Sequence, residues 1–405
     1  MVCGLKRTIR LSKGGSTMNK YISVLGQILG LFPKAEFYEA VRKTGAEKGA
    51  KGFSSWEHFA AMLFCQIGQA QSLREIVGGL SSAMGKLKHL GIDDGPKRST
   101  LSYANNHRPW QLYETIFYSF LQRCMAQFRG KKRFKFNSKL YSMDATLIEL
   151  CAELFPWADY RQTKGAVKLH LLLDHEGYLP VFADLTRGNI HEINVAKRLS
   201  FPKGSIIAMD MGYTDYSLYG RWTEEGVYFV TRQKDNAKYE VIEQRTIPQN
   251  RNIRKDEIIR LTGYYASLDC PYDLRRIEVL DEENDRVIVL LTNHLKFGST
   301  TIAAIYKERW NIEIFFKHLK QNLRIKTFVG TSPNAVLTQI WTALIAILVL
   351  KYMQFRSTFS WSLSNLIAML RYNLFTYRDL WEWLNKPFDT PPTEPETYQP
   401  GLFQN

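Results

Sequence analysis

Four side chains suited to contacting a phosphodiester are spaced along one segment in the last third of the chain. Tyr306, Arg309, Glu313 and Lys320 follow one another at intervals of three, four and seven residues. Because successive helical residues are separated by about 100°, all four would fall within an arc of roughly 60° on one helix. The spacing therefore predicts a helix that presents a carboxylate between cations and an aromatic ring. The alternative interpretation is a solvated amphipathic face.

Two aspartates belong to apolar segments that we expect to be strands. Asp144 lies within the segment YSMDAT, and Asp210 ends the apolar segment GSIIAMD. Acids at the strand ends of α/β sheets commonly face a ligand crevice. The alternative for each is a core acid with a local hydrogen bond. The chain has 39 acidic residues, so the combination of Asp144, Asp210 and Glu313 gains weight only from its placement on regular, apolar elements.

These three acids together could hold two divalent cations. Mg²⁺ prefers carboxylate and water oxygens, and Mn²⁺ is the alternative ion. Two such ions can clamp the attacking and leaving oxygens of an in-line phosphoryl displacement. Arg309 and Lys320 could supply the positive charge that a phosphate backbone requires.

The composition is compatible with a nucleic-acid partner. The 405 residues include 54 Lys and Arg against 39 Asp and Glu, a formal charge of +15, which favours a polyanionic partner. No apolar run reaches the length of a membrane span, and Trp341–Leu350 indicates a buried helix, so we expect no membrane partner. The five cysteines include no CxxC pair, which indicates neither a disulfide framework nor a zinc ribbon and favours a reducing cytoplasm.

The pattern of elements divides the chain into five parts. We expect an α/β fold preceded by helices, with the parts as follows: a basic N-terminal segment, 1–20; a helical region, 21–130, to which the resemblance described below assigns DNA binding; an α/β region, 131–355, to which it assigns catalysis, with a β-rich insertion at about 222–295; a helical region, 356–385; and a flexible Pro-rich tail, 386–405. The expected core strands are 139–147, 167–174, 179–185 and 204–210, those of the insertion are 227–232, 257–266, 275–280 and 286–291, and the helices are 299–323, 334–354 and 361–385.

Two segments of the N-terminal region carry helix signals. Ser54 and Glu57 have capping-box spacing, and Gly68 is a plausible stop for the helix that follows them. The short polar and basic segment 98–108 is a candidate recognition helix, with a plain surface helix as the alternative.

The residues above resemble a known family. The spacing of Tyr306, Arg309, Glu313 and Lys320 is similar to the YREK signature of DDE-type insertion-sequence transposases of the insertion-sequence-four group. Asp144 within MDAT and Asp210 within DMGY resemble the first and second catalytic aspartates of that family. The segment 186–192 (TRGNIHE) is similar to a stretch that these enzymes carry before the second aspartate.

The resemblance implies an RNase H-like catalytic core interrupted by a β-strand insertion. It implies a cytoplasmic, nucleoid-associated prokaryotic enzyme for cut-and-paste transposition that depends on two Mg²⁺ ions. Its partners would be the terminal inverted repeats, the target DNA and a second copy of the chain in a synaptic complex. Asp144, Asp210 and Glu313 would be the catalytic metal ligands, and Tyr306, Arg309 and Lys320 would contact DNA.

Two features depart from the family pattern. Met211 replaces the Arg that relatives often carry after the second aspartate, and the insertion lacks the Trp on which a flipped base stacks. Tyr264, Tyr265 and Tyr272 are candidate substitutes that the sequence does not distinguish. The alternatives for the whole chain are a catalytically inactive or domesticated DNA-binding protein and another RNase H-like nuclease.

Overall fold

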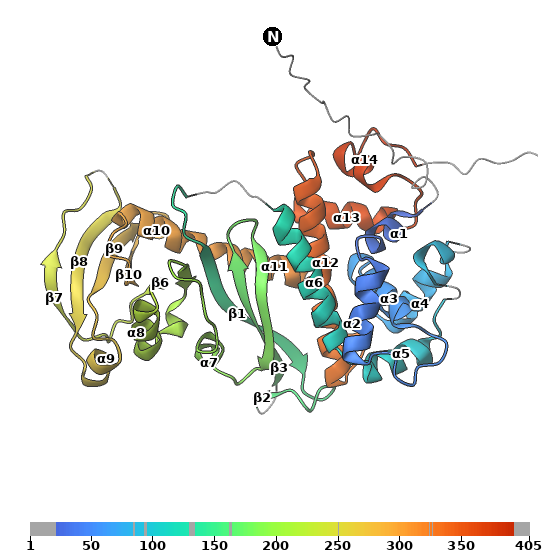
Figure 1. Cartoon of the computed structure of the whole chain (residues 1–405), viewed down its shortest axis with the longest axis horizontal. Helices are drawn as coiled ribbons and strands as arrows, with labels where there is room; N and C mark the ends of the chain where they lie inside the picture. The colour runs from blue at the N-terminus through green and yellow to red at the C-terminus, as the bar shows by residue number, and fades with distance from the viewer. Residues whose placement is uncertain are drawn as a thin grey trace, which may run out of the picture. The chain divides into compact units, whose positions relative to one another are not determined.

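The chain forms two compact units, Met1–Leu112 with Val349–Asn405 and Tyr113–Leu348 (Figure 1). This computed structural model describes residues 22–83, 86–92, 95–128, 134–161, 164–249, 251–323, 325 and 327–392. The predicted basic segment, 1–20, and most of the predicted Pro-rich tail lie outside these residues.

The first unit is helical. Its core includes an aromatic cluster in which the Phe37 and Trp56 ring centroids lie 5.0 Å apart. The predicted capping box is confirmed, since Ser54 and Glu57 cap each other reciprocally, and the helix ends at Gly68 as expected. The elements are α1 (Val24–Leu29), α2 (Lys34–Thr44), α3 (Ser55–Ile67), α4 (Leu73–Ser81), η2 (Lys88–Leu90), α5 (Arg98–His107), α13 (Leu363–Asn373) and α14 (Leu380–Asn385). Two further helices, α6 (Gln111–Gln127) and α12 (Pro333–Arg356), have residues in both units.

The second unit is built on one ten-stranded mixed sheet. Its first strand, β1 (Leu140–Cys151), is antiparallel to β3 (Lys164–Asp174) and parallel to β5 (Ile206–Met209). On the outer sides, β4 (Leu179–Arg187) pairs antiparallel with β3, and β6 (Tyr228–Arg232) pairs parallel with β5. The order β4-β3-β1-β5-β6, with these directions, is that of an RNase H-like core, as predicted. The short strand β2 (Asp159–Arg161) also pairs with β3.

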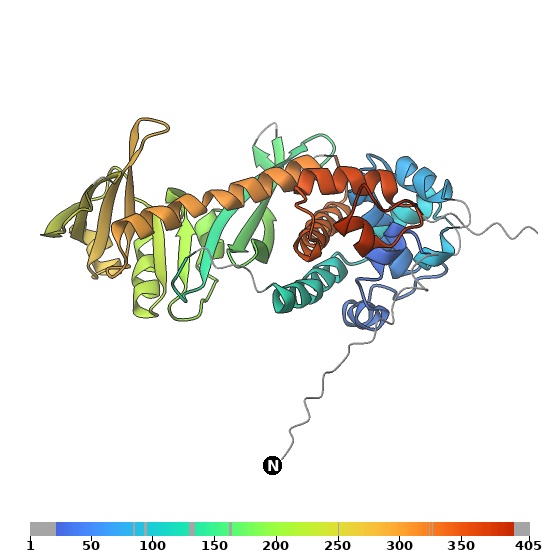
Figure 2. The same cartoon turned by 90° about the horizontal axis from the view of Figure 1, so that it is seen from above.

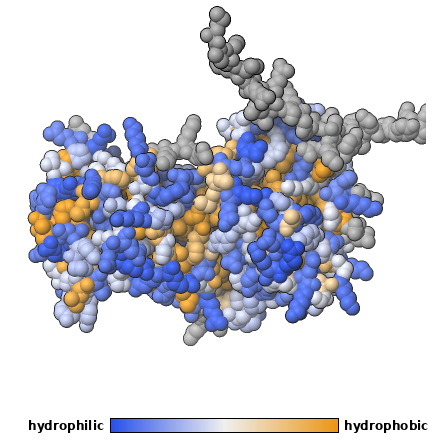
Figure 3. All heavy atoms as spheres, viewed as in Figure 1, coloured by the Kyte–Doolittle hydropathy of each residue, from blue (hydrophilic) through white to orange (hydrophobic). Residues whose placement is uncertain are grey.

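The insertion continues the same sheet beyond β6. Its last strand, β10 (Arg286–Thr292), pairs with β6, and β9 (Leu274–Asp281), β8 (Ile253–Leu261) and β7 (Tyr239–Gln244) follow in that order. The helix α9 (Tyr264–Asp269) follows β8 along the chain. The strand β7 forms an edge of the sheet, and its apolar residues Val241 and Ile242 are exposed at the surface (Figure 3).

Alternation along the strands gives the sheet two distinct faces, and Figure 2 shows α10 (Ser299–Glu308) and α11 (Trp310–Asn322) running along one of them. Ile207 and Met209 of β5 pack with Trp222 of α8 (Tyr216–Glu224), near α7 (Glu192–Ala196). Their neighbours Ile206 and Ala208 join the opposite cluster with α10. Asp144 therefore lies on the α10 face, because it has the same parity as Leu140, which belongs to that cluster.

The α12 helix is the most apolar element among the described residues. By length and composition it could cross a membrane, but 83% of its most apolar window is buried within the protein. One such helix is weak evidence for a span, and this degree of burial is that of a core helix.

Several predicted elements differ from the structure. The expected strand 257–266 ends at Leu261 and is followed by α9, and the expected helix 361–385 is two helices, α13 and α14. The strand β7 was not expected, because its exposed side chains do not alternate in polarity. The expected helix 299–323 is divided at Arg309 into α10 and α11 (Trp310–Asn322).

The division at Arg309 has a local cause. The Arg309 amide donates to Tyr306 O, and the Ile312 amide donates to Arg309 O, both bonds spanning three residues. This tightening is of the 3₁₀ type, and the backbone of Arg309 remains right-handed helical at φ −52° and ψ −33°. Side chains on the two helices therefore keep the common stripe that the sequence predicts.

Candidate active site

The three predicted acids lie at the centre of the sheet, on its α10 face. Asp144 projects from β1, Asp210 directly follows β5, and Glu313 lies in the first turn of α11. The parallel pairing of β1 with β5, in which Met143 is opposite Met209, brings the two aspartates to neighbouring positions. The charges of Asp210 and Glu313 both act on Asp144 and raise its pKa. The structure therefore places on one face of the sheet acids that are far apart in the sequence.

Asp210 is held in place by the tight turn that follows β5. Its Oδ1 accepts a hydrogen bond of 2.7 Å from the Gly212 amide, and its backbone carbonyl accepts one of 3.0 Å from Thr231 Oγ1. A Cβ at Gly212 would lie only 2.9 Å from this Oδ1. Glycine at this position therefore leaves room for the carboxylate.

The Arg309 guanidinium lies between the other two acids. Its Nη2 donates to Glu313 Oε1 at 2.6 Å, and its Nη1 lies 3.6 Å from Asp144 Oδ2. Its Cζ also lies 5.5 Å from the centroid of the Tyr306 ring. Burial would lower the pKa of Arg309, but Tyr306, Glu313 and Asp144 raise it, so the side chain remains cationic.

Burial dominates the electrostatics of Asp144. Desolvation raises its pKa from 3.8 to about 7, while the Ala145 amide and Arg309 oppose that rise. Perturbed carboxylates in such surroundings are typical of functional sites, because a bound cation favours the ionised form. Burial also raises the pKa of Tyr213, and among its neighbours the charges of Asp144, Glu192 and Asp210 act in the same direction.

The predicted DNA-contact residues lie around this group of acids. Tyr306 is half-buried, and Arg309 and Arg232 both lower its pKa, which burial raises. Lys320 lies in the last turn of α11, about 10 Å along the axis from Glu313 at the usual helical rise. The stripe therefore begins at the acids and continues along α11.

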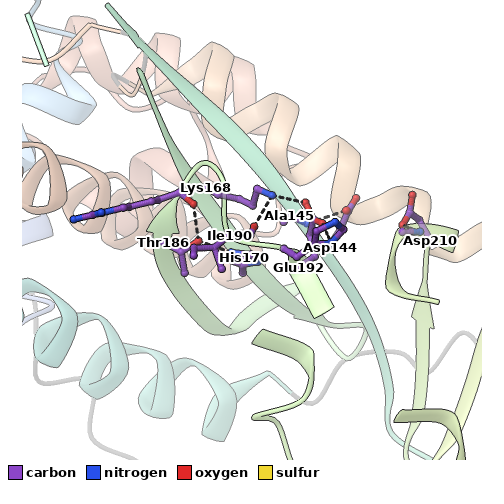
Figure 4. A network of polar contacts seen from close by, with 11 residues as sticks. Asp144, Ala145, Lys168, His170, Thr186, Ile190, Glu192 and Asp210 are labelled. Carbon is purple, nitrogen blue, oxygen red and sulfur yellow. Dashed lines mark hydrogen bonds and ion pairs between the residues drawn. The ribbon is translucent and has the colours of Figure 1, made fainter. Parts of the chain in front are cut away.

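The donor set fits a hard divalent cation, although the acids are not preformed into a cluster. No group of three His, Cys, Asp or Glu side chains close enough to hold a metal ion exists within the described ranges. Asp144 and Glu313 nevertheless converge on a single positive charge, that of Arg309, which occupies the place of a cation. Asp210 stands apart from this pair and is turned toward its own loop (Figure 4).

A second ion pair joins β3 to the start of α7 and was not predicted. Lys168 of β3 donates to Glu192 Oε1 and to Ile190 O, both at 2.8 Å (Figure 4). Glu192 belongs to the segment TRGNIHE, in which the sequence predicts no role for this residue. The sequence signals for this pair are a lysine on a buried strand and an acid at the start of a short helix. A single sequence does not show that these two side chains meet.

Comparison with known proteins identifies the family. A model for the transposase DDE domain matches residues 136–349, and residues 20–93 match a domain family of unknown function. The match to the transposase domain covers more than half of the chain. This chain belongs to the DDE transposase family.

Its relatives are transposases of insertion sequences. A putative transposase of Sinorhizobium fredii is 31% identical over 260 residues, covering 63% of this chain and 71% of the relative. A probable transposase for the element IS5377 of Geobacillus stearothermophilus is 28% identical over 70% of this chain and 76% of its own. A putative transposase for the element IS4SA of Synechocystis is 23% identical over 62% of this chain and 70% of the relative. The predicted family is therefore confirmed.

Other polar and aromatic residues of this transposase differ in their surroundings. His170 is buried, and its Nε2 lies 2.8 Å from Thr186 Oγ1, whereas its Nδ1 has no hydrogen-bond partner among the described residues. Lys168 uses its ammonium in the internal pair with Glu192. Of the aromatic candidates in the insertion, Tyr264 and Tyr265 are 74% and 78% exposed on α9, whereas Tyr272 packs partly against the core.

Proposed function

We propose that this transposase cleaves the ends of its insertion sequence and transfers them to target DNA by metal-dependent, in-line phosphoryl displacement. The observation that carries the proposal is the convergence of Asp144 and Glu313 on one positive charge within a DDE domain. The acids come from a strand, a strand end and a helix of that domain, which is the arrangement that the YREK resemblance implies.

Asp144, Asp210 and Glu313 would hold two Mg²⁺ ions, or Mn²⁺ in their place. When bound, such ions activate the attacking oxygen and stabilise the leaving oxygen. The chain's own residues supply the rest. Burial places the carboxylate of Asp144 in poorly solvated surroundings, and the Gly212 amide donates a hydrogen bond to the carboxylate of Asp210.

Tyr306, Arg309 and Lys320 would position the DNA. A guanidinium pairs well with phosphate oxygens, and Arg309 has a phosphate-binding group within reach of the acids. The ring of Tyr306 lies against the same guanidinium, and Lys320 extends the cationic stripe along α11. These side chains would place a phosphodiester over the carboxylates.

The remaining partners follow from the same proposal. The helical unit would recognise the terminal inverted repeats, and two copies of the chain would hold two ends in one synaptic complex. The net charge of +15 favours such contacts and makes the affinity fall with salt concentration. The protein would act on the nucleoid in the cytoplasm.

The test compares binding with cleavage on DNA that carries the element's ends. Asp144→Ala should abolish Mg²⁺-dependent strand cleavage, while gel-shift affinity for the ends remains within about twofold, because phosphate contacts supply most of the affinity. Asp235→Asn, a change of an exposed loop carboxylate, is the matched control and should cleave like the wild type.

Three outcomes would contradict the proposal. Cleavage by Asp144→Ala at the wild-type rate would remove this acid from the chemistry. A wild-type protein that binds ends but never cleaves them would favour an inactive or domesticated DNA-binding protein, and cleavage independent of the end sequence would favour another nuclease.

A further inference from the structure

A buried polar network joins the α10–α11 junction to β1, beside the candidate active site. We call Ser142, His175, Tyr178, Glu308 and Asn311 the Glu308 network. Ser142 Oγ lies 2.7 Å from His175 Nε2, and His175 Nδ1 lies 3.9 Å from Glu308 Oε2. The same Oε2 accepts hydrogen bonds from Tyr178 Oη at 3.0 Å and from Asn311 Nδ2 at 3.1 Å.

The arrangement of Ser, His and Glu resembles that of a nucleophilic triad, but the surroundings exclude this role. Ser142 is fully buried, with 0% of its surface exposed. The cavity beside the network, lined by Ser138, Tyr178 and Glu308 among others, has a volume of about 30 Å³. Such a volume holds water and excludes a substrate. The Glu308 network therefore serves to attach the α10–α11 junction to β1.

The attachment lies directly beside the acids. Ser142 and Asp144 are two residues apart on β1 and project from the same face of the sheet. Their partners on the helices are consecutive, because Ser142 reaches Glu308 through His175, and Asp144 faces Arg309. The junction that carries Arg309 and Glu313 is therefore fastened to β1 at two adjacent points.

The turn that supplies His175 and Tyr178 adopts a conformation that favours this contact. Tyr178 has φ +54°, which residues other than glycine rarely adopt, and Gly177 precedes it with φ +121°. Non-glycine residues in this region persist where surrounding contacts determine them and are concentrated at functional sites. Here the contact is the bond from the Tyr178 hydroxyl to Glu308.

The Arg309 contact and the Glu308 network would respond differently to a bound cation. A divalent ion at Asp144 and Glu313 would compete with the Arg309 guanidinium for the same oxygens, so the Arg309 contact is lost as the site fills. The Glu308 network uses none of these oxygens. It can hold the junction while Arg309 moves to a phosphate.

We propose that Tyr178, His175 and Glu308 are positioning residues that keep Glu313 opposite Asp144 when Arg309 releases the two carboxylates. The inference rests on the proposed function, since it assigns these residues to the metal-bound state. It predicts that damage to the network weakens metal binding without removing any metal ligand.

The test titrates the DNA-free, full-length protein with Mn²⁺ and detects free Mn²⁺ by electron paramagnetic resonance. Tyr178→Phe and Glu308→Leu should each weaken Mn²⁺ binding by about tenfold, the usual effect of removing a group that orients a metal ligand. Both should raise the Mg²⁺ concentration for half-maximal cleavage by a similar factor. Glu308→Gln retains an oxygen that accepts from Tyr178 and should restore most of the affinity.

Tyr118→Phe is the matched control. It also removes a half-buried tyrosine hydroxyl of the same unit, one that exchanges hydrogen bonds with the Ala183 backbone. It should bind Mn²⁺ like the wild type, which separates positioning from a general loss of stability. Circular dichroism melting identifies any variant that fails to fold.

The outcomes separate the two proposals. A wild-type protein that binds Mn²⁺, with Tyr178→Phe binding it equally well, would overturn the positioning role alone. A wild-type protein that binds no Mn²⁺ would overturn the proposed metal site and this inference with it.

Discussion

The guanidinium of Arg309 lies 3.6 Å from the carboxylate of Asp144, between that acid and Glu313. The chain therefore carries its own cation at the position where the proposed function requires a metal ion. The positive charge offsets the repulsion of two half-buried carboxylates, and it belongs to a residue that the family resemblance assigns to DNA. Metal loading and DNA contact are thereby connected through one side chain.

The first prediction concerns this internal cation. Arg309→Met removes the competitor for the carboxylate oxygens, so Mn²⁺ should bind the DNA-free protein about tenfold more tightly at pH 8, equivalent to roughly 1.4 kcal/mol. Strand cleavage should nevertheless decrease, because the phosphate contact is lost. The measurement is a calorimetric Mn²⁺ titration. Arg309→Lys keeps the charge and should resemble the wild type; a weaker affinity in Arg309→Met would show that the guanidinium supports the metal instead of competing with it.

The second prediction concerns pH and stability in metal-free protein. Burial raises the pKa of Asp144 from 3.8 to about 7, so between these values the native state retains a proton that the unfolded state has lost. The contribution of Asp144 to stability is therefore present below about pH 4 and is lost as pH rises through 7, by up to about 4 kcal/mol. Asp144→Asn lacks this titration.

The measurement is urea unfolding of both proteins in EDTA from pH 4.5 to 8. The free energy of unfolding of Asp144→Asn, relative to the wild type, should rise across this range. Parallel pH profiles for the two proteins would show that Asp144 titrates at its ordinary value.

The third prediction concerns the turn that holds Asp210. Gly212→Ala would place a Cβ 2.9 Å from Asp210 Oδ1, the free end of a side chain that can rotate away. The stability should therefore change by no more than about 0.5 kcal/mol, while metal-dependent cleavage falls at least tenfold. Gly298→Ala is the control, because the nearest contact of its Cβ is 3.8 Å away. A Gly212→Ala protein that is unfolded, or one that cleaves normally, would contradict this explanation.

The sequence predicted the core strands and the helical stripe well because they depend on local pattern. The strand around Asp144 and the one ending at Asp210 have apolar neighbours that specify burial, and the stripe from Tyr306 to Lys320 follows from helical spacing alone. The RNase H-like order came from the family resemblance, since periodicity does not specify which strands are neighbours.

The sequence does not predict the contacts between distant segments. Arg309 was expected to face DNA, and its position between Asp144 and Glu313 depends on the depth at which α11 packs on β1. The same is true of Glu308, which lies between Tyr306 and Arg309 in the sequence but turns toward His175 and Tyr178. Long-range packing determines both, and no local pattern encodes it.

The last prediction concerns the ion pair between Lys168 and Glu192. Lys168 is buried on β3, and its ammonium compensates Glu192, whose charge also reaches the surroundings of Tyr213. Lys168→Met leaves that carboxylate and the Ile190 carbonyl without this donor, so the free energy of unfolding should fall by about 1–3 kcal/mol. Adding Glu192→Gln removes the uncompensated charge and should recover part of the loss, and urea unfolding of the two single variants and the double variant gives the coupling. If Lys168→Met is instead as stable as the wild type but loses affinity for DNA, the ammonium contacts DNA and the internal pair is incidental to folding.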